Sequence, residues 1–134
     1  MNPRYLFVYG TLKRDANNGL HPLLLKHAEF IGNASYQGKL YTIDTYPGAI
    51  PSDDPNDAVQ GEVYLLHQAD SVLPILDRYE EFGPAFPEPN EYIRLKQSVL
   101  LKNGCAITAW VYVYNHPIAG LERIKPADFI QHPL

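Results

Sequence analysis

Twelve prolines, distributed through a chain of only 134 residues, are the feature that most constrains how this sequence folds. Proline removes a backbone hydrogen-bond donor and disrupts helix interiors, so this many prolines favour short segments joined by turns. The chain also contains ten tyrosines, a residue type that is enriched in strands. Together these residues predict a strand-rich protein and argue against a helix bundle.

Size and charge set the broad class. With 134 residues and 46% apolar residues, the chain is expected to form a single globular domain over residues 1–134. The net charge of −4 and the absence of a basic run argue against nucleic-acid binding. No apolar stretch approaches the roughly 20 residues that span a bilayer, and the run at 5–9 is too short for a signal peptide. We therefore expect a cytoplasmic protein without a membrane partner, and the sequence predicts no particular oligomeric state.

Several kinds of site are absent from the sequence. The single cysteine, Cys105, excludes an intramolecular disulfide framework and a cysteine-based zinc site. The five histidines have no metal-ligand spacing, and there is no dinucleotide-binding, P-loop or nucleophile-elbow motif. We therefore expect neither a metal nor an organic cofactor.

Apolar periodicity and turn residues divide the chain into expected elements. Val72, Leu73 and Leu76 recur at helical spacing, which predicts a helix over residues 70–79 with Asp70 as its N-cap. Asn103 and Gly104 are typical of a hairpin turn. Strands are expected at residues 4–9, 59–66, 92–101 and 105–114, with one or two more within 29–43. Loops are expected at 45–57 and 82–90, a short helix at 20–28, and a tail at 116–134 with a helix near 127–130. This order is that of an α+β fold with a curled or closed sheet.

Two segments are candidates for a functional site. Tyr9, Gly10, Thr11 and Leu12 directly follow the first strand, and a glycine there allows a sharp turn whose backbone N–H groups can hold a carboxylate or an oxyanion. The alternative is an ordinary turn that ends a strand.

Glu80 lies beside the apolar stripe at the end of the clear helix. The negative end of the helix dipole and partial burial both raise the pKa of such a carboxyl, which suits it to proton transfer near neutral pH. The alternative is a solvated helix end with Glu80 and Glu81 as surface charges.

Taken together, these segments resemble the gamma-glutamylcyclotransferase-like family, and within it most nearly the gamma-glutamylamine cyclotransferase branch. The resemblance covers about residues 5–114 and rests on the order and separation of its motifs rather than on any single one. The motifs are Val8–Arg14, Leu40–Tyr41, Tyr46–Gly48, Gly61–Tyr64, Leu76–Glu80, Tyr92–Arg94 and Trp110–Tyr114.

The resemblance implies a small mixed β-barrel with one or two helices packed outside it. It also implies a cofactor-independent enzyme that cyclises a γ-glutamyl group to 5-oxoproline and releases the attached amine or amino acid. In this interpretation Glu80 is the catalytic residue, and Tyr9, Gly10, Thr11 and Leu12 bind the glutamyl head of a small-molecule substrate.

Other interpretations stay open at this point. Glu62 is the rival general base, and Arg94 is expected to pair with a carboxylate. Tyr112 and Tyr114 either line the pocket or fill the barrel. The sequence departs from the family pattern at Asp15, where glycine is usual, and in the longer segment 81–91, so the γ-glutamyl substrate is not identified. The alternatives are a deprotecting cyclotransferase that acts on a biosynthetic intermediate, or a non-catalytic binding or structural domain that retains the barrel.

Overall fold

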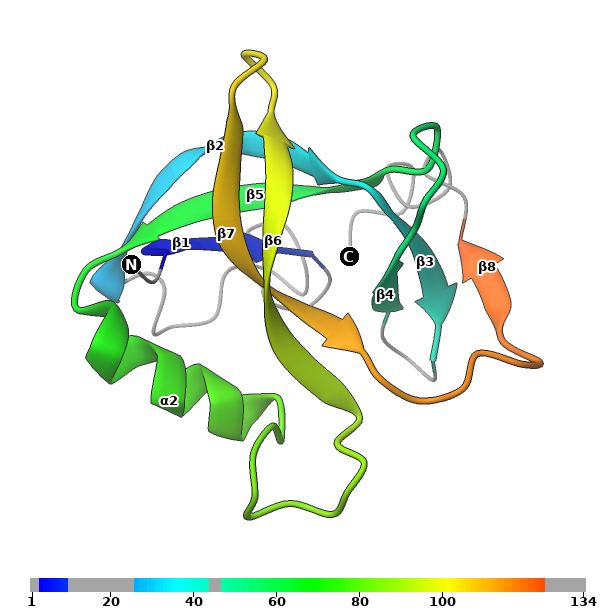
Figure 1. Cartoon of the computed structure of the whole chain (residues 1–134). Helices are drawn as coiled ribbons and strands as arrows, with labels where there is room; N and C mark the ends of the chain where they lie inside the picture. The colour runs from blue at the N-terminus through cyan, green and yellow to red at the C-terminus, as the bar shows by residue number, and fades with distance from the viewer. Residues whose placement is uncertain (1–2, 10–25, 44–46, 125–134) are drawn as a thin grey trace.

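Five strands hydrogen-bond in a closed ring in the computed structural model, which describes residues 3–9, 26–43 and 47–124 (Figure 1). Around the ring they are β1 (Tyr5–Val8), β5 (Val59–Leu66), β2 (Ala28–Tyr36), β6 (Tyr92–Leu101) and β7 (Ala106–Tyr114). The β1–β7 pair that closes the ring is parallel, and the other neighbours are antiparallel. The predicted α+β fold with a small mixed barrel is confirmed.

The barrel interior is filled by one face of each strand. Alternate residues point inward because successive side chains of a strand point to opposite faces of a sheet. A β-carbon at Gly61 would lie 2.4 Å from the Val8 carbonyl oxygen and 2.6 Å from the Phe7 ring, so β1 packs against β5 only because residue 61 is glycine. The interior residues include Phe7, Tyr36, Val59, Val63, Val99, Val111 and Val113.

The helix α2 (Ala69–Tyr79) packs on the outside of the barrel (Figure 1). Its buried stripe of Val72, Leu73 and Leu76 contacts a second apolar cluster formed by outward residues of the strands. Those outward residues include Leu6, Val8, Tyr64, Leu66, Tyr92 and Tyr112. The helix therefore ends close to the strands that carry Tyr92 and Tyr112.

A second, three-stranded sheet lies beside the barrel in the order β4 (Pro47–Pro51), β3 (Gly38–Thr42) and β8 (Glu122–Ile124). The prediction of a loop over 45–57 is wrong for β4. Its two prolines, Pro47 and Pro51, stand at the ends of an edge strand, where a missing backbone donor is tolerated. The predicted tail contains β8, whose three residues are too few to show an alternation.

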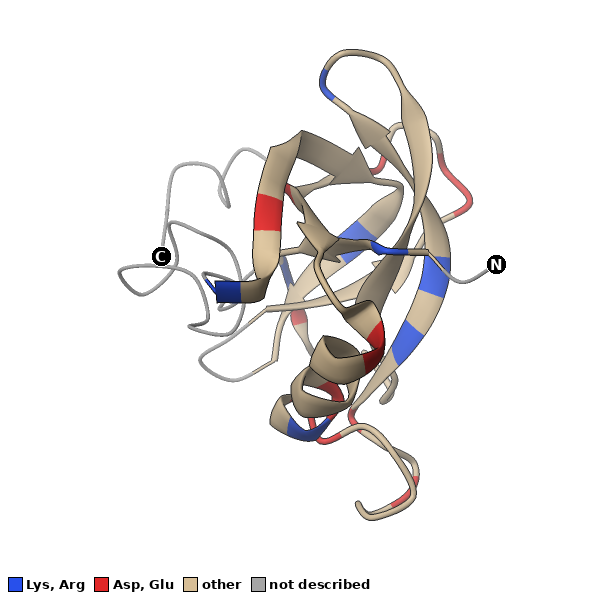
Figure 2. Ribbon diagram, turned by 90° about the vertical axis from the view of Figure 1, so that its left-hand side faces the viewer, with Lys and Arg blue, Asp and Glu red and all other residues tan. Residues whose placement is uncertain are grey.

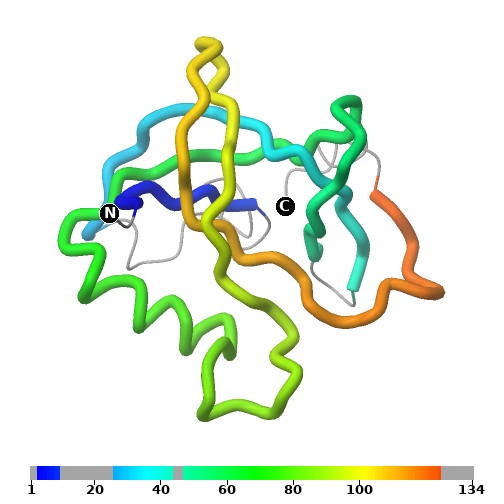
Figure 3. Tube along the Cα trace, in the orientation of Figure 1, coloured from blue at the N-terminus to red at the C-terminus, as the bar shows by residue number. Residues whose placement is uncertain are grey.

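The trace in Figure 3 leaves α2, turns back through a loop and enters the long β6–β7 hairpin. That hairpin is confirmed, and Gly104 in its turn has a φ of +96°. Residues 29–43 form two strands, β2 and β3, as the prediction of one or two strands there allows, with a break near Gly38 and a register shift between Phe30 and Gly32. The N-cap prediction is wrong: Gln68 is the N-cap and Asp70 lies in the first turn of the helix.

Some expectations fall partly or wholly beyond what the structure describes. Residues 20–25 of the first expected helix and residues 127–130 of the tail lie outside the described residues. Lys and Arg are distributed over several separate elements of the described chain (Figure 2). Within the described residues, no helix has both the length and the apolar character needed to cross a bilayer.

Candidate functional site

Glu80 is the residue at which α2 ends. Glu81 follows it with a left-handed φ of 55°, so the chain turns sharply away from the helix axis. The N–H of Phe82 bonds to the carbonyl of Asp77 at 2.8 Å, and the N–H of Glu81 bonds to the carbonyl of Arg78 at 3.1 Å. These two bonds form a Schellman motif, in which Glu80 is the C-cap residue.

The last turn of α2 is also tied to the barrel through the side chain of Asp77. Arg94 of β6 donates from Nε to Oδ1 at 2.7 Å and from Nη2 to Oδ2 at 3.0 Å. The hydroxyl of Tyr112 on β7 donates to the same Oδ1 at 2.7 Å. The Arg94 guanidinium lies 4.3 Å from the centre of the Trp110 ring. The prediction that Arg94 pairs with a carboxylate is confirmed.

Tyr9, directly after β1, joins this arrangement from the other side. Its hydroxyl donates to the backbone carbonyl of Tyr112 at 2.5 Å and accepts the backbone N–H of Ala49 at 3.0 Å. Burial raises the pKa of the Tyr9 hydroxyl, and the negative charge of Glu80 raises it further. Tyr9 is therefore rigidly held within electrostatic range of Glu80.

Glu80 itself is partly buried, and burial is the main cause that raises its pKa to about 7. The second cause is the negative charge of Glu91, which disfavours a second ionised carboxylate nearby. Glu91 is fixed at the end of the 81–91 segment because its backbone carbonyl accepts the N–H of Asn115 at 2.7 Å. At neutral pH, Glu80 is thus present in both its protonated and its ionised form.

Comparison with known proteins shows to which family the chain belongs. The family model described as gamma-glutamyl cyclotransferase, AIG2-like, matches residues 6–131. The chain belongs to this family. It is 33% identical over 126 residues to the gamma-glutamylcyclotransferase family protein YtfP of Escherichia coli K12, with 93% of this chain and 95% of that protein covered.

Two further relatives extend the comparison. A gamma-L-glutamyl-butirosin B gamma-glutamyl cyclotransferase of Niallia circulans is 35% identical over 114 residues, which cover 82% of this chain and 66% of that protein. The crystal structure of an AIG2-like protein from Mus musculus has a TM-score of 0.66 at 25% identity, with 87% of this chain and 82% of that chain covered.

Within this gamma-glutamyl cyclotransferase fold, only some of the predicted site residues are among those that the structure describes. Tyr9 follows β1 and Glu80 caps the end of α2, and the charge of Glu80 contributes to the raised pKa of the Tyr9 hydroxyl. Gly10, Thr11 and Leu12 lie outside the described residues. The rival Glu62 is only 4% exposed on β5, and its Oε1 accepts the Tyr64 hydroxyl at 2.8 Å.

The two tyrosines left open by the sequence have different surroundings. Tyr112 lies outside the barrel against α2, so it does not fill the interior. Burial raises the pKa of its hydroxyl, and the bond to Asp77 raises it further. Tyr114 is half-buried, with its ring edge-on to Tyr92 and to His116, both at 5.7 Å between ring centres.

Three residues around this site, Asp77, Ala49 and Glu91, were not predicted from the sequence. Asp77 precedes Glu80 by three residues, so helical spacing alone places both on one side of α2. The pairing of Asp77 with Tyr112 depends on the β6–β7 register, which places Arg94 opposite Tyr112.

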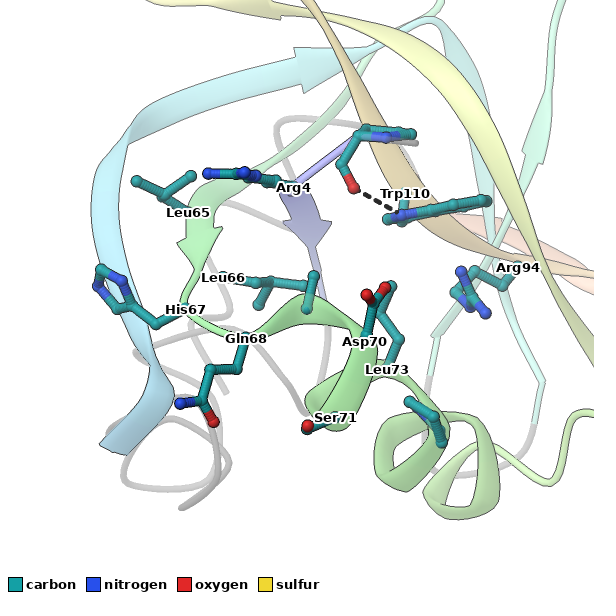
Figure 4. Close-up of a pocket in the computed structure, with 13 residues that line it drawn as sticks. Arg4, Leu65, Leu66, His67, Gln68, Asp70, Ser71, Leu73, Arg94 and Trp110 are labelled. Carbon is teal, nitrogen blue, oxygen red and sulfur yellow. Dashed lines mark hydrogen bonds between the residues drawn. The ribbon is translucent and has the colours of Figure 1, made fainter. Parts of the chain in front are cut away.

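A separate groove lies at the N-terminal end of α2 (Figure 4). Asp70 and Leu73 of the helix, Arg4 and His67, and Trp110 and Arg94 from the hairpin surround it. The Trp110 indole N–H donates to the Pro3 carbonyl at 3.0 Å, shown as the dashed line in Figure 4. No group of three or more His, Cys, Asp or Glu side chains suited to a metal ion occurs in the described part of the chain.

Proposed function

We propose that this chain converts a γ-glutamyl amine or γ-glutamyl amino acid to 5-oxoproline and the free amine, with Glu80 as general acid and base. The supporting observation is the position and protonation of one carboxyl. Glu80 has a pKa raised to about 7 and lies near Tyr9, the first residue of the turn that the family resemblance assigns to the glutamyl head.

The reaction needs a proton acceptor that becomes a proton donor. Ionised Glu80 takes one proton from the α-ammonium group, and the freed amine attacks the γ-carbonyl carbon of the same glutamyl unit. Protonated Glu80 then gives its proton to the leaving nitrogen as the carbon–nitrogen bond breaks. The ring nitrogen loses its second proton to the regenerated carboxylate, which passes it to the released amine. Atoms and charge balance without water, oxidant or cofactor.

A pKa of about 7 suits both halves of this cycle. General acid–base catalysis is most effective when the pKa of the group is near the working pH, because both forms are then populated. A carboxyl at its ordinary value near 4.5 would be a weak proton donor to the leaving nitrogen at neutral pH.

Recognition of the glutamyl head is assigned to Tyr9, Gly10, Thr11 and Leu12 on the family resemblance. The support from the described residues is the double anchoring of the Tyr9 hydroxyl by Ala49 and Tyr112, which holds the Tyr9 side chain in place directly before Gly10. Backbone N–H groups of the turn then hold the α-carboxylate or the tetrahedral oxyanion.

The leaving amine is proposed only as a chemical class, whereas the glutamyl head is assigned to named residues. The sequence resemblance points to the gamma-glutamylamine branch, and the N. circulans relative is named for a γ-glutamyl conjugate, butirosin B. A γ-glutamyl unit attached through nitrogen is common to both. We therefore propose γ-glutamyl amines as the first substrates to test, with the cytoplasm as the compartment.

The test is 5-oxoproline release from γ-glutamyl-lysine, γ-glutamyl amino acids and glutathione, measured side by side. Glu80→Gln is expected to lower kcat by about 10²–10⁴-fold on the best substrate, since it removes the proton transfer. Glu62→Gln is the matched control because a glutamine oxygen still accepts the Tyr64 hydroxyl, and it is expected to keep kcat within about threefold.

Two outcomes contradict the proposal. One is an absence of 5-oxoproline from every substrate, which favours a non-catalytic binding domain. The other is wild-type activity in Glu80→Gln together with lost activity in a folded Glu62→Gln, which moves the general base to Glu62.

A further inference from the structure

We propose that Asp77 is a positioning residue: its carboxylate ties the end of α2 to β6 and β7 and thereby fixes the Glu80 carboxylate relative to Tyr9. This inference rests on the role proposed above for Glu80. In this inference, the position of the proton-transferring carboxylate depends on hydrogen bonds between residues that do not themselves react.

The first step of the argument is that Asp77 controls the turn that carries Glu80. The Asp77 backbone carbonyl accepts the N–H of Phe82 at 2.8 Å, which closes the Schellman motif around Glu80. The Asp77 side chain accepts three further bonds from Arg94 and Tyr112. A displacement of Asp77 therefore moves both ends of the turn in which Glu80 lies.

The second step is that the donors to Asp77 are themselves fixed. Arg94 and Tyr112 are direct partners across the β6–β7 ladder, so one hairpin supplies all three of these bonds to the Asp77 carboxylate. The bidentate geometry restricts the orientation of Asp77 as well as its position. The side chains of Arg94 and Asp77 are only 16% and 17% exposed, so solvent screens their attraction less than that of a surface pair.

The third step joins this clamp to Tyr9. Tyr112 holds Asp77 through its hydroxyl and accepts the Tyr9 hydroxyl on its backbone carbonyl, at 2.7 Å and 2.5 Å respectively. One residue thus contacts both the last turn of the helix and the residue that begins the proposed glutamyl-binding turn. We therefore infer that Tyr112 fixes the distance between the Glu80 carboxylate and the glutamyl head that Tyr9 is proposed to bind.

The expected signature is a loss of kcat with little change in KM. Misplacing a reacting group by about 1 Å can cost on the order of 10²-fold in rate. We expect Asp77→Asn to lower kcat about 10- to 100-fold, and Tyr112→Phe, which removes one hydroxyl, about 3- to 10-fold. KM for γ-glutamyl-lysine should stay within about threefold, because the Tyr9 bond to the backbone of residue 112 is retained.

A second signature is the pH dependence of kcat. The acidic limb of the wild-type kcat–pH profile reports ionisation of Glu80. The charge of Glu91 disfavours that ionisation, and the charge of Glu80 in turn acts on the hydroxyls of Tyr9 and Tyr112. The Asp77–Arg94 pair acts on the same Tyr112 hydroxyl. Moving Glu80 changes its burial, so the limb should shift in Asp77→Asn and also in Tyr112→Phe, which breaks one bond to Asp77 without changing any charge. A residue that only stabilised the fold would lower the melting temperature and leave the limb of the folded enzyme in place.

The chain offers a matched control in Asp57. This carboxylate also accepts one arginine and one hydroxyl, from Arg123 at 2.6 Å and from Ser52 at 2.5 Å. It joins the 52–57 segment to β8, which belongs to the three-stranded sheet rather than to the barrel strands that hold Asp77. Asp57→Asn is expected to lower the melting temperature while leaving kcat within about twofold and the acidic limb unchanged.

The variants separate the possible outcomes. If Asp77→Asn does not fold, Tyr112→Phe decides, because its ring still packs against α2. Wild-type kcat and an unmoved acidic limb in folded Asp77→Asn, or in Tyr112→Phe, overturn the inference. If those variants behave like wild type but Glu80→Gln is inactive, the positioning role of Asp77 is wrong and the proposed function stands. Wild-type activity in Glu80→Gln instead overturns the proposed function together with this inference.

Discussion

At its C-terminal end, α2 is tied to two strands through Asp77, whereas at its N-terminal end no hydrogen bond from the Gln68 side chain caps the helix. Both ends place a non-glycine residue in the left-handed region, Gln68 with φ 59° and Glu81 with φ 55°. One end carries Glu80, whose charge acts on Tyr9, and the other lines the groove of Figure 4.

The difference between the two ends shows which part of α2 is held by side-chain hydrogen bonds. A side-chain N-cap typically contributes about 0.5–2 kcal/mol, and α2 forms without one. The buried stripe of Val72, Leu73 and Leu76, together with the Asp77 bonds at the other end, therefore holds the helix on the barrel without a side-chain N-cap. The additional bonds are concentrated at the end where, in the proposed reaction, a carboxyl must meet a substrate.

The largest expected effect is on the free energy of unfolding. It tests whether burial of the Glu80 carboxyl at the C-terminal end of α2 destabilises the folded protein at neutral pH. Burial raises the pKa of Glu80 from 4.5 to about 7, so the folded protein favours the neutral form. The stability linked to that form is fully present below pH 4.5 and is lost as the pH rises through 7. Glu80→Gln stays neutral, so it should become more stable than wild type by on the order of 1–3 kcal/mol above pH 7.

Urea unfolding of both proteins at a series of pH values from 4.5 to 8.5 measures this difference. Gln68→Ala, at the opposite end of the helix, provides the comparison because it exchanges one neutral side chain for another. If the difference in unfolding free energy between Glu80→Gln and wild type stayed constant with pH, burial would not raise the pKa of Glu80.

The next effect concerns the left-handed residue that follows Glu80. A non-glycine residue in this region costs about 1–2 kcal/mol, which glycine avoids at the expense of some unfolded-state entropy. We expect Glu81→Gly to stabilise the protein by roughly 0.5–1 kcal/mol. Glu81→Ala retains the backbone strain and should give no comparable gain. Equal midpoints in urea for both variants would contradict the Schellman geometry.

The smallest expected effect concerns Glu91. Its negative charge helps to raise the pKa of Glu80, so Glu91→Gln should move the acidic limb of kcat to lower pH. At a pH just below the wild-type limb, the variant should be roughly twofold more active, because more Glu80 is ionised. A limb that stays in place or moves upward would show that Glu91 does not act on Glu80.

The long elements of the fold could be predicted because their patterns are local. The helix stripe at Val72, Leu73 and Leu76 and the turn at Asn103–Gly104 each lie within one segment. β4 could not be predicted, because Pro47 and Pro51 are acceptable only at an edge strand, which is a property of the whole sheet. Gln68 as N-cap has no sequence signal either, since Asp70 has the stronger capping preference.

The candidate site was predictable to a similar extent. The position of Glu80 at a helix end follows from periodicity, and its raised pKa agrees with the expected direction. That Arg94 pairs with a carboxylate was predicted, but the choice of Asp77 depends on the register between β6 and β7. The contribution of Glu91 depends on how the 81–91 segment returns to the barrel, which no local pattern specifies.

The parallel pairing of β1 with β7 also sets an order of events during synthesis. The two residues joined by the Tyr9–Tyr112 hydrogen bond are 103 positions apart in the chain. At about 5–20 residues per second, a ribosome needs roughly 5–20 seconds between them. Throughout that interval the edge of β1 that later meets β7 has no partner strand, and an unpaired edge is a template for aggregation. Substitutions that weaken β7 should therefore reduce the yield of nascent protein more than the activity of the molecules that complete the barrel.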